Sequence, residues 1–165
     1  MEARILDIGV GTGQVGVHLA ALGFGLVDGI DVSPAMLERA AAKGCYQRLI
    51  EADASEAAAV PPRSYDAIIS VGTLLLPNHI TDGDVLRRWL SWLKPGGLAC
   101  LSMRTDLWLE AEADAEHGVP GVAAALEAEG HWSLVETTDP AVYTPRVDAE
   151  ISFQVRIYCT DRKGG

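Results

Sequence analysis

The residues best suited to chemistry lie close to the ends of short apolar runs in the first third of the chain. Asp7 lies in the first run, and glycines follow it at positions 9, 11, 13 and 16. Asp31 closes the second run, and Asp53 follows the third. Glycine lets a ligand approach the backbone closely, and carboxylates accept hydrogen bonds from hydroxyl and amine groups. A strand, a glycine turn and a helix in this order are typical of a nucleotide-binding site.

The glycine spacing is compatible with two kinds of cofactor. Gly11-Thr-Gly-Gln-Val-Gly16 has the G-x-G-x-x-G spacing of dinucleotide-binding domains. The carboxylate of Asp7, however, would repel the pyrophosphate of a dinucleotide and would attract a cofactor that carries a sulfonium and an ammonium. Asp7 therefore favours a sulfonium cofactor, and a nicotinamide oxidoreductase is the weaker alternative.

Residues 6–13, Leu-Asp-Ile-Gly-Val-Gly-Thr-Gly, resemble motif I of the class I S-adenosylmethionine-dependent methyltransferases. The resemblance continues through four further segments: Gly29–Ala40, Glu51–Ala54, Tyr65–Val71 and Leu93–Gly97. Within this superfamily the chain is similar to the small methyltransferase-like subfamily of the Williams–Beuren syndrome region, over Leu26–Glu38, Lys43–Gln47 and Lys94–Thr105. The resemblance implies a three-layer Rossmann-like α/β fold, with a mostly parallel seven-stranded sheet and an antiparallel C-terminal strand.

The same resemblance implies a set of residues that bind S-adenosylmethionine. Asp31, which lies 20 residues beyond Gly11, would accept hydrogen bonds from the ribose hydroxyls. Asp53 would accept from the adenine amine, and the backbone at Ala54 would meet a ring nitrogen; Asp53 could also cap a short helix. The full expected set is Asp7, Gly9, Gly11, Gly13, Asp31, Val32, Met36, Asp53, Ala54 and Ser70.

Periodicity indicates how these residues are positioned. The spacing of Val15, Leu19 and Leu22 predicts an amphipathic helix over Gln14–Leu22 with these three residues on its apolar face. In the last strand, 151–160, apolar residues alternate with polar ones, as expected for an antiparallel strand with its apolar face on the core. Cys100 and Cys159 fall in expected strands, where we expect buried, inert thiols.

Composition narrows the possible partners and the cellular location. The chain has 165 residues, which suits one domain over 1–165, and its net charge of −10 makes a nucleic-acid acceptor unlikely. The three cysteines lack C-x-x-C spacing, so neither a metal site nor a disulfide is supported. No apolar segment is long enough to span a membrane and no signal peptide is visible, so we expect a cytoplasmic protein.

The resulting prediction is a methyltransferase that acts on a small-molecule or protein acceptor. Methyl transfer needs alignment of donor and acceptor more than a catalytic triad. A general base is needed only for an acceptor that carries a proton, and His79 is the first candidate and His117 the second. The alternative is a catalytically silent cofactor-binding protein. Because the first strand begins about four residues after Met1, we expect no lid helices ahead of it and a possible homodimer over the exposed face.

Overall fold

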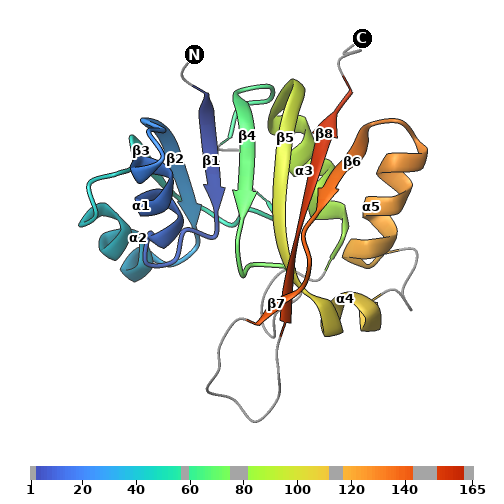
Figure 1. Cartoon of the computed structure of the whole chain (residues 1–165). Coiled ribbons are helices and arrows are strands. Elements are labelled where there is room, and N and C mark those ends of the chain that lie inside the picture. Colours follow the sequence, from blue (N-terminus) through green and yellow to red (C-terminus); the bar gives the residue numbers. More distant parts are fainter. Residues whose placement is uncertain (1–2, 57–59, 75–81, 112–116, 143–151, 162–165) are drawn as a thin grey trace.

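A twisted sheet of mostly parallel strands runs through the centre of the molecule, with helices on its two sides (Figure 1). The computed structural model describes residues 3–56, 60–74, 82–111, 117–142 and 152–161. The strands are β1 (Arg4–Ile8), β2 (Leu26–Asp31), β3 (Arg48–Glu51), β4 (Tyr65–Ser70), β5 (Leu93–Arg104), β6 (Trp132–Thr137), β7 (Ala141–Val142) and β8 (Ser152–Thr160). The helices are α1 (Gln14–Ala21), α2 (Pro34–Ala41), α3 (Asp84–Trp92), α4 (Thr105–Ala111) and α5 (Val119–Ala128).

The strand order is β3-β2-β1-β4-β5-β8-β6, and the short β7 pairs with β8. Strands β3, β2, β1, β4 and β5 pair in parallel, so their carboxyl ends lie along one edge of the sheet. Strand β8 runs antiparallel to both β5 and β6. This arrangement confirms the expected Rossmann-like sheet with an antiparallel C-terminal strand, and β7 is a short addition to it.

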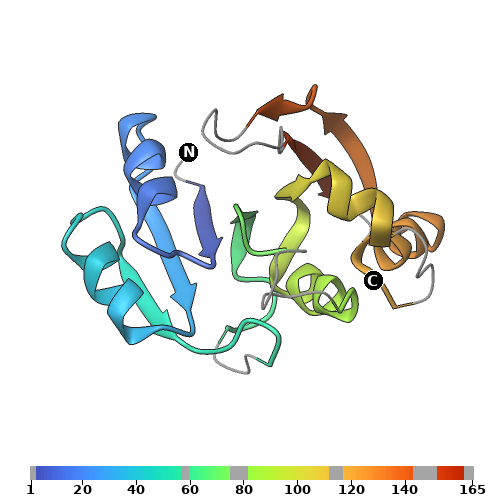
Figure 2. The same cartoon turned by 90° about the horizontal axis from the view of Figure 1, so that it is seen from below.

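The main core lies between the sheet and the helices α3 and α5. Strands β1, β4 and β5 supply Leu6, Ile68 and Leu101, and helix α3 supplies Leu86 and Trp89, all nearly inaccessible to solvent. On the opposite face, α1 covers the β1–β2 end through Leu19, which packs with Ile5 and Val27. The two faces of the sheet are therefore covered by different helices (Figure 2).

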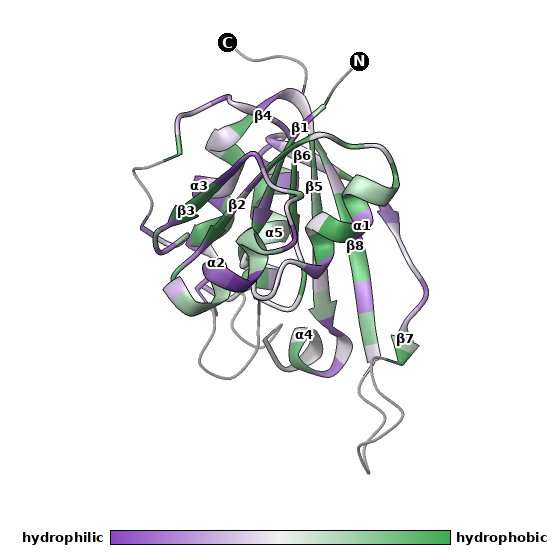
Figure 3. Cartoon of the chain, turned by 90° about the vertical axis from the view of Figure 1, so that its left-hand side faces the viewer, coloured by the Kyte–Doolittle hydropathy of each residue, from purple (hydrophilic) through white to green (hydrophobic). Residues whose placement is uncertain are grey.

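Over β5 and β8, the face on the α1 side is not covered by any described helix (Figures 1 and 2). The apolar residues of β8 lie on this face and are only half-buried: Phe153, Val155, Ile157 and Cys159. Figure 3 shows the alternation of hydrophobic and hydrophilic residues along this strand. The fully buried aromatic of β8 is Tyr158, which faces the other way and stacks on Trp132 at 4.2 Å. The expectation that the alternating apolar residues face the core was wrong, because the main core receives the other side of this strand.

Two smaller expectations also differ from the structure. Leu22 is 74% exposed because α1 ends at Ala21 and Leu22 forms its C-cap. Cys100 is half-buried, like Cys159, because both thiols lie on the face that no described helix covers. In the described ranges, no helix combines the length and apolar character needed to cross a lipid bilayer.

Candidate cofactor site

A cleft of about 850 Å³ opens at the carboxyl ends of the parallel strands, where open α/β sheets bind their ligands. Its size is that of a site for a small molecule or cofactor. The described residues that line it come from the glycine turn, the ends of β2 and β3, and the segment after β4. They are Gly9, Val10, Gly11, Thr12, Gln14, Val15, Ile30, Asp31, Val32, Ser33, Met36, Ala52, Asp53, Ala54, Ser55, Val71, Gly72, Thr73 and Asp82.

The three glycines of the turn share a left-handed backbone, with φ values of 73° at Gly9, 52° at Gly11 and 82° at Gly13. Their surroundings differ. A β-carbon on Gly11 would meet no atom closer than 3.9 Å, so this position faces open space. A β-carbon on Gly13 would lie 3.0 Å from the Ala40 Cα in α2. Gly11 therefore leaves room for a ligand, whereas Gly13 lets α1 and α2 pack together.

Asp31 connects the end of β2 to the glycine turn. One of its carboxylate oxygens accepts from the Gly11 amide at 2.8 Å, and the other accepts from the Ser33 amide at 2.8 Å. Ser33 occupies the N-cap position of α2 but makes no capping bond with its own side chain. Each carboxylate oxygen can accept more than one hydrogen bond, so Asp31 can orient the turn and still accept from a ribose.

Asp53 lines the far side of the cleft, after β3. Its Oδ1 accepts from both the amide and the hydroxyl of Ser55, and these bonds hold the pKa of Asp53 below its usual value. An ionised Asp53 is a suitable acceptor for an amine, because a carboxylate has more than one site for hydrogen bonds. The neighbouring Ala54 is held by its carbonyl, which accepts from the Trp89 indole at 3.2 Å. Val32 and Met36 complete this part of the wall.

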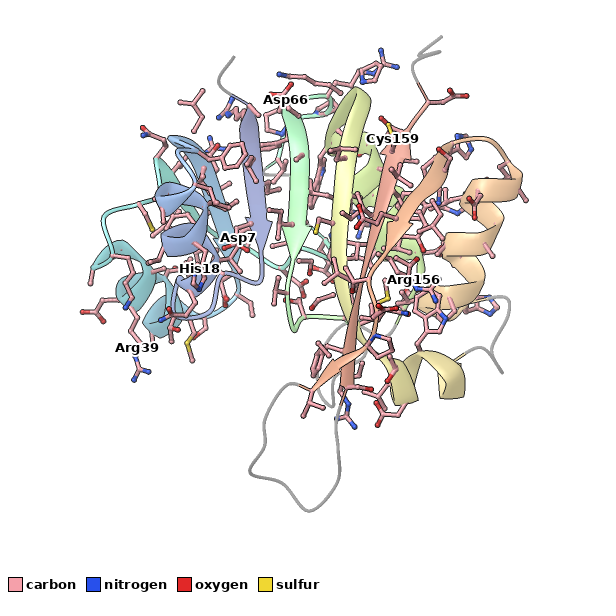
Figure 4. All side chains as sticks on the ribbon, in the orientation of Figure 1. Asp7, His18, Arg39, Asp66, Arg156 and Cys159 are labelled. Atoms are coloured by element: carbon pink, nitrogen blue, oxygen red, sulfur yellow. The ribbon has the colours of Figure 1, made fainter. Side chains whose placement is uncertain are left out.

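Asp7 lies near the carboxyl end of β1, where Figure 4 labels it, and it is not among the residues that line the cleft. It is only 1% exposed. Tyr46 donates a hydrogen bond to its Oδ2 at 2.7 Å, and the same hydroxyl accepts from the Gly16 amide. Its Oδ1 has no partner among the described residues. Burial raises the pKa of Asp7 to about 6; the Tyr46 hydrogen bond opposes this shift, and the charge of Asp31 adds to it.

Seven of the ten expected residues line the cleft, and Asp7, Gly13 and Ser70 do not. Ser70 is fully buried, and no described residue bonds its hydroxyl. His79 lies outside the described residues. His117 is exposed, and its carbonyl accepts from the Gly83 amide at 2.7 Å. Roles in cofactor binding or catalysis for these residues remain predictions.

Several polar residues of the wall were not among the expected residues, and Thr73 and Asp82 are two of them. The Oδ1 of Asp82 accepts from the Asp84 amide at 2.9 Å at the start of α3. Thr73 lies in the segment that follows β4. Its position three residues beyond a buried strand was the available signal, because loops at the carboxyl edge of such sheets form the ligand site.

Comparison with known proteins shows to which family the protein belongs. The sequence profile of a family described as "Methyltransferase domain" matches residues 5–97, more than half of the chain. The chain belongs to this family of methyltransferases. Solved structures that share its fold are described as S-adenosylmethionine-dependent methyltransferases, and together with the family match they give S-adenosylmethionine as the cofactor.

Two curated relatives extend the similarity beyond that domain. Human methyltransferase-like protein 27 is 37% identical over 135 residues, which cover 79% of this chain and 51% of the relative. Trans-aconitate 2-methyltransferase of Methylobacterium radiotolerans is 35% identical over 139 residues, 83% of this chain and 48% of the relative. The chain thus spans about half the length of the curated relatives it matches.

A solved structure supports the fold. An S-adenosylmethionine-dependent methyltransferase from Methanosarcina mazei superposes with a TM-score of 0.70 at 17% identity, over 97% of this chain and 93% of that one. The cleft fits the cofactor on independent grounds. The open space at Gly11 would be filled by any β-carbon, and carboxylates stand at three points along the wall. Asp31 and Asp53 would hold its ribose and adenine, respectively.

Proposed function

We propose that this protein transfers the methyl group of S-adenosylmethionine to a small-molecule acceptor. One observation carries the proposal: a single cleft brings together the glycine turn, Asp31 at the end of β2 and Asp53 after β3. When bound, S-adenosylmethionine supplies a methyl group already activated by its sulfonium. The work left to the protein is to hold the donor in line with an acceptor and to keep water out.

The residues of the cleft are suited to that work. Asp31 fixes the glycine turn through the Gly11 amide and offers its remaining lone pairs to hydroxyl groups. The wall contains carboxylates at Asp31, Asp53 and Asp82, and none of its described residues is Lys, Arg or His. Such a wall favours a cationic ligand over the anionic dinucleotides that other Rossmann-like folds bind.

Two observations support a small molecule as the acceptor. The net charge of −10 opposes binding to nucleic acid. One relative is named for methylation of trans-aconitate, which is a small molecule. Arg104, at the carboxyl end of β5, could bind an anionic acceptor, although its guanidinium now pairs with Asp106.

The test is transfer of label from methyl-labelled S-adenosylmethionine to material extracted from cells. The extract is divided by size into metabolites, proteins and nucleic acids, and each fraction is incubated with the wild-type chain and with Gly11→Val. We expect label in the metabolite fraction with the wild type only. Label in the protein fraction would mean that the acceptor is a protein, which would overturn the proposal of a small-molecule acceptor. Cofactor binding without transfer to any fraction would favour the catalytically silent alternative.

A further inference from the structure

The segment that follows β4 is anchored to the glycine turn by Thr73. The Thr73 hydroxyl donates a hydrogen bond to the Ile8 carbonyl at 3.2 Å. Its side chain also occupies the space beside Gly9: a β-carbon on Gly9 would lie 2.1 Å from Thr73 Oγ1 and 2.9 Å from Cγ2. Gly9 and Thr73 are therefore a matched pair, in which the missing side chain of one makes room for the other.

A second anchor holds the same segment from the other side. Ser102 on β5 is 5% exposed, and its hydroxyl accepts from the Gly72 amide at 3.0 Å. Gly72 itself has a φ of 68°, a left-handed conformation that favours glycine at this turn of the chain. Two hydroxyl groups, one from the segment and one from β5, thus fix residues 71–73 between β1 and β5.

The strand order shows what this segment faces. The groups suited to ribose and adenine, Asp31 and Asp53, stand at the ends of β2 and β3, on one side of β1. Residues 71–73 line the same cleft at the end of β4, on the other side of β1. With its nucleoside at Asp31 and Asp53, the rest of the cofactor would be held by cleft residues at the ends of β1 and β4, and residues 71–73 are among them.

We propose that Thr73 is a positioning residue for methyl transfer. By packing on Gly9 and bonding to the Ile8 carbonyl, it sets the distance between the glycine turn and the wall at residues 71–73. This distance fixes the line along which donor and acceptor meet, and small errors in that alignment are costly in rate. The inference rests on the proposed function, because it assigns Thr73 a part in the same reaction.

The test compares Thr73→Val, which keeps the shape and loses the hydroxyl, with Thr73→Ser, which keeps the hydroxyl. Affinity for S-adenosylhomocysteine is measured by calorimetry, and methyl transfer by the labelling assay at saturating cofactor. We expect Thr73→Val to weaken affinity, because the glycine turn loses one of its anchors. The transfer rate should fall by more than the affinity does, by up to about a hundredfold, because alignment of donor and acceptor is the more sensitive quantity. Thr73→Ser should restore most of both.

A double-mutant cycle tests the matched pair directly. Gly9→Ala should weaken binding through its clash with Thr73, and adding Thr73→Ala should recover part of the loss, although the strain of a positive φ remains. Thr160→Val is the control, because Thr160 donates a similar bond to the Lys94 carbonyl at 3.0 Å, at the opposite edge of the sheet. It should lower the melting temperature and leave affinity unchanged.

The results that overturn the proposal are distinct from those that overturn the function. If the wild type binds S-adenosylhomocysteine and the Thr73 variants match it in affinity and rate, Thr73 has no positioning role. The same conclusion follows if Thr73→Ala gives no recovery in Gly9→Ala. A wild-type chain that binds no S-adenosylhomocysteine would refute the proposed function, and this inference with it.

Discussion

Replacing Asp7 by Asn should make the protein more stable at neutral pH. Asp7 is buried, and one of its oxygens has no partner in the described part of the chain. Its pKa is raised from 3.8 to about 6, mainly by burial. An ionised Asp7 therefore opposes folding at pH 7, where an amide of nearly the same shape would not. The amide oxygen can still accept the hydrogen bond from Tyr46.

The size of the effect follows from the two pKa values. Each pKa unit corresponds to about 1.4 kcal/mol of free energy, so ionising Asp7 in the folded protein costs at most about 3 kcal/mol. The direction of the pH dependence follows from which state of the chain, folded or unfolded, holds more protons. Between pH 4 and pH 6, roughly, the folded chain holds this proton and the unfolded chain does not, so the contribution of Asp7 to stability falls as pH rises. The gain from Asp7→Asn should thus be small near pH 4 and full above pH 7.

The assay is denaturant unfolding of both chains at several pH values, with the difference between them plotted against pH. Asp53 and Asp66 have lowered pKa values, so the stability that they contribute to the fold is lost in acid. Both chains contain these residues, so their contributions cancel in the difference. Asp28→Asn is the control, since Asp28 is equally buried but accepts from Arg4 and Tyr65, so its loss should destabilise at pH 7. A difference for Asp7→Asn that does not change with pH would refute the reasoning.

Three further predictions concern the cleft. Asp31→Ala should weaken S-adenosylmethionine binding by about 1–3 kcal/mol in calorimetry, and unchanged affinity in a folded variant would contradict its placement at the ribose. Gly11→Val should abolish binding with an unchanged circular dichroism spectrum, whereas Gly13→Val, which crowds α2, should lower the melting temperature. If the two variants had equal effects in both assays, Gly11 and Gly13 would not have the different roles assigned to them. Because carboxylates such as Asp53 and Asp82 line the cleft, S-adenosylmethionine should bind more tightly than S-adenosylhomocysteine, and by a margin that shrinks as salt is added. Equal affinities at low salt would show that these charges do not select the ligand.

The sequence predicted the elements of the site better than the contacts between them. The strands that end at Asp31 and just before Asp53 could be predicted, because each depends on the pattern of residues within one element. The glycine turn could be predicted from the strand before it and the helix after it. The burial of Asp7 did not, because it depends on Tyr46, which lies 39 residues away at the start of another segment. The pairing of Thr73 with Gly9, 64 positions apart, was equally invisible.

The last strand shows a different limit of pattern analysis. Its period of two correctly gave an antiparallel strand, because alternation depends only on the pleat of the backbone. It could not show which face of the sheet the helices cover. Tyr158, counted with the polar residues, is the one that enters the core, because α5 and β6 supply Trp132 and its neighbours on that side.

The face of β5 and β8 that no described helix covers affects how the protein behaves in solution. Half-buried apolar residues such as Val155 and Ile157 attract similar surfaces on other molecules, while the charge of −10 keeps those molecules apart. Salt weakens the repulsion, since its range falls to about 8 Å at physiological ionic strength. Sulfate in addition strengthens apolar association. If this face is exposed, the protein should remain monomeric in dilute buffer. It should associate through this face as the sulfate concentration is raised, and dilution should reverse the association.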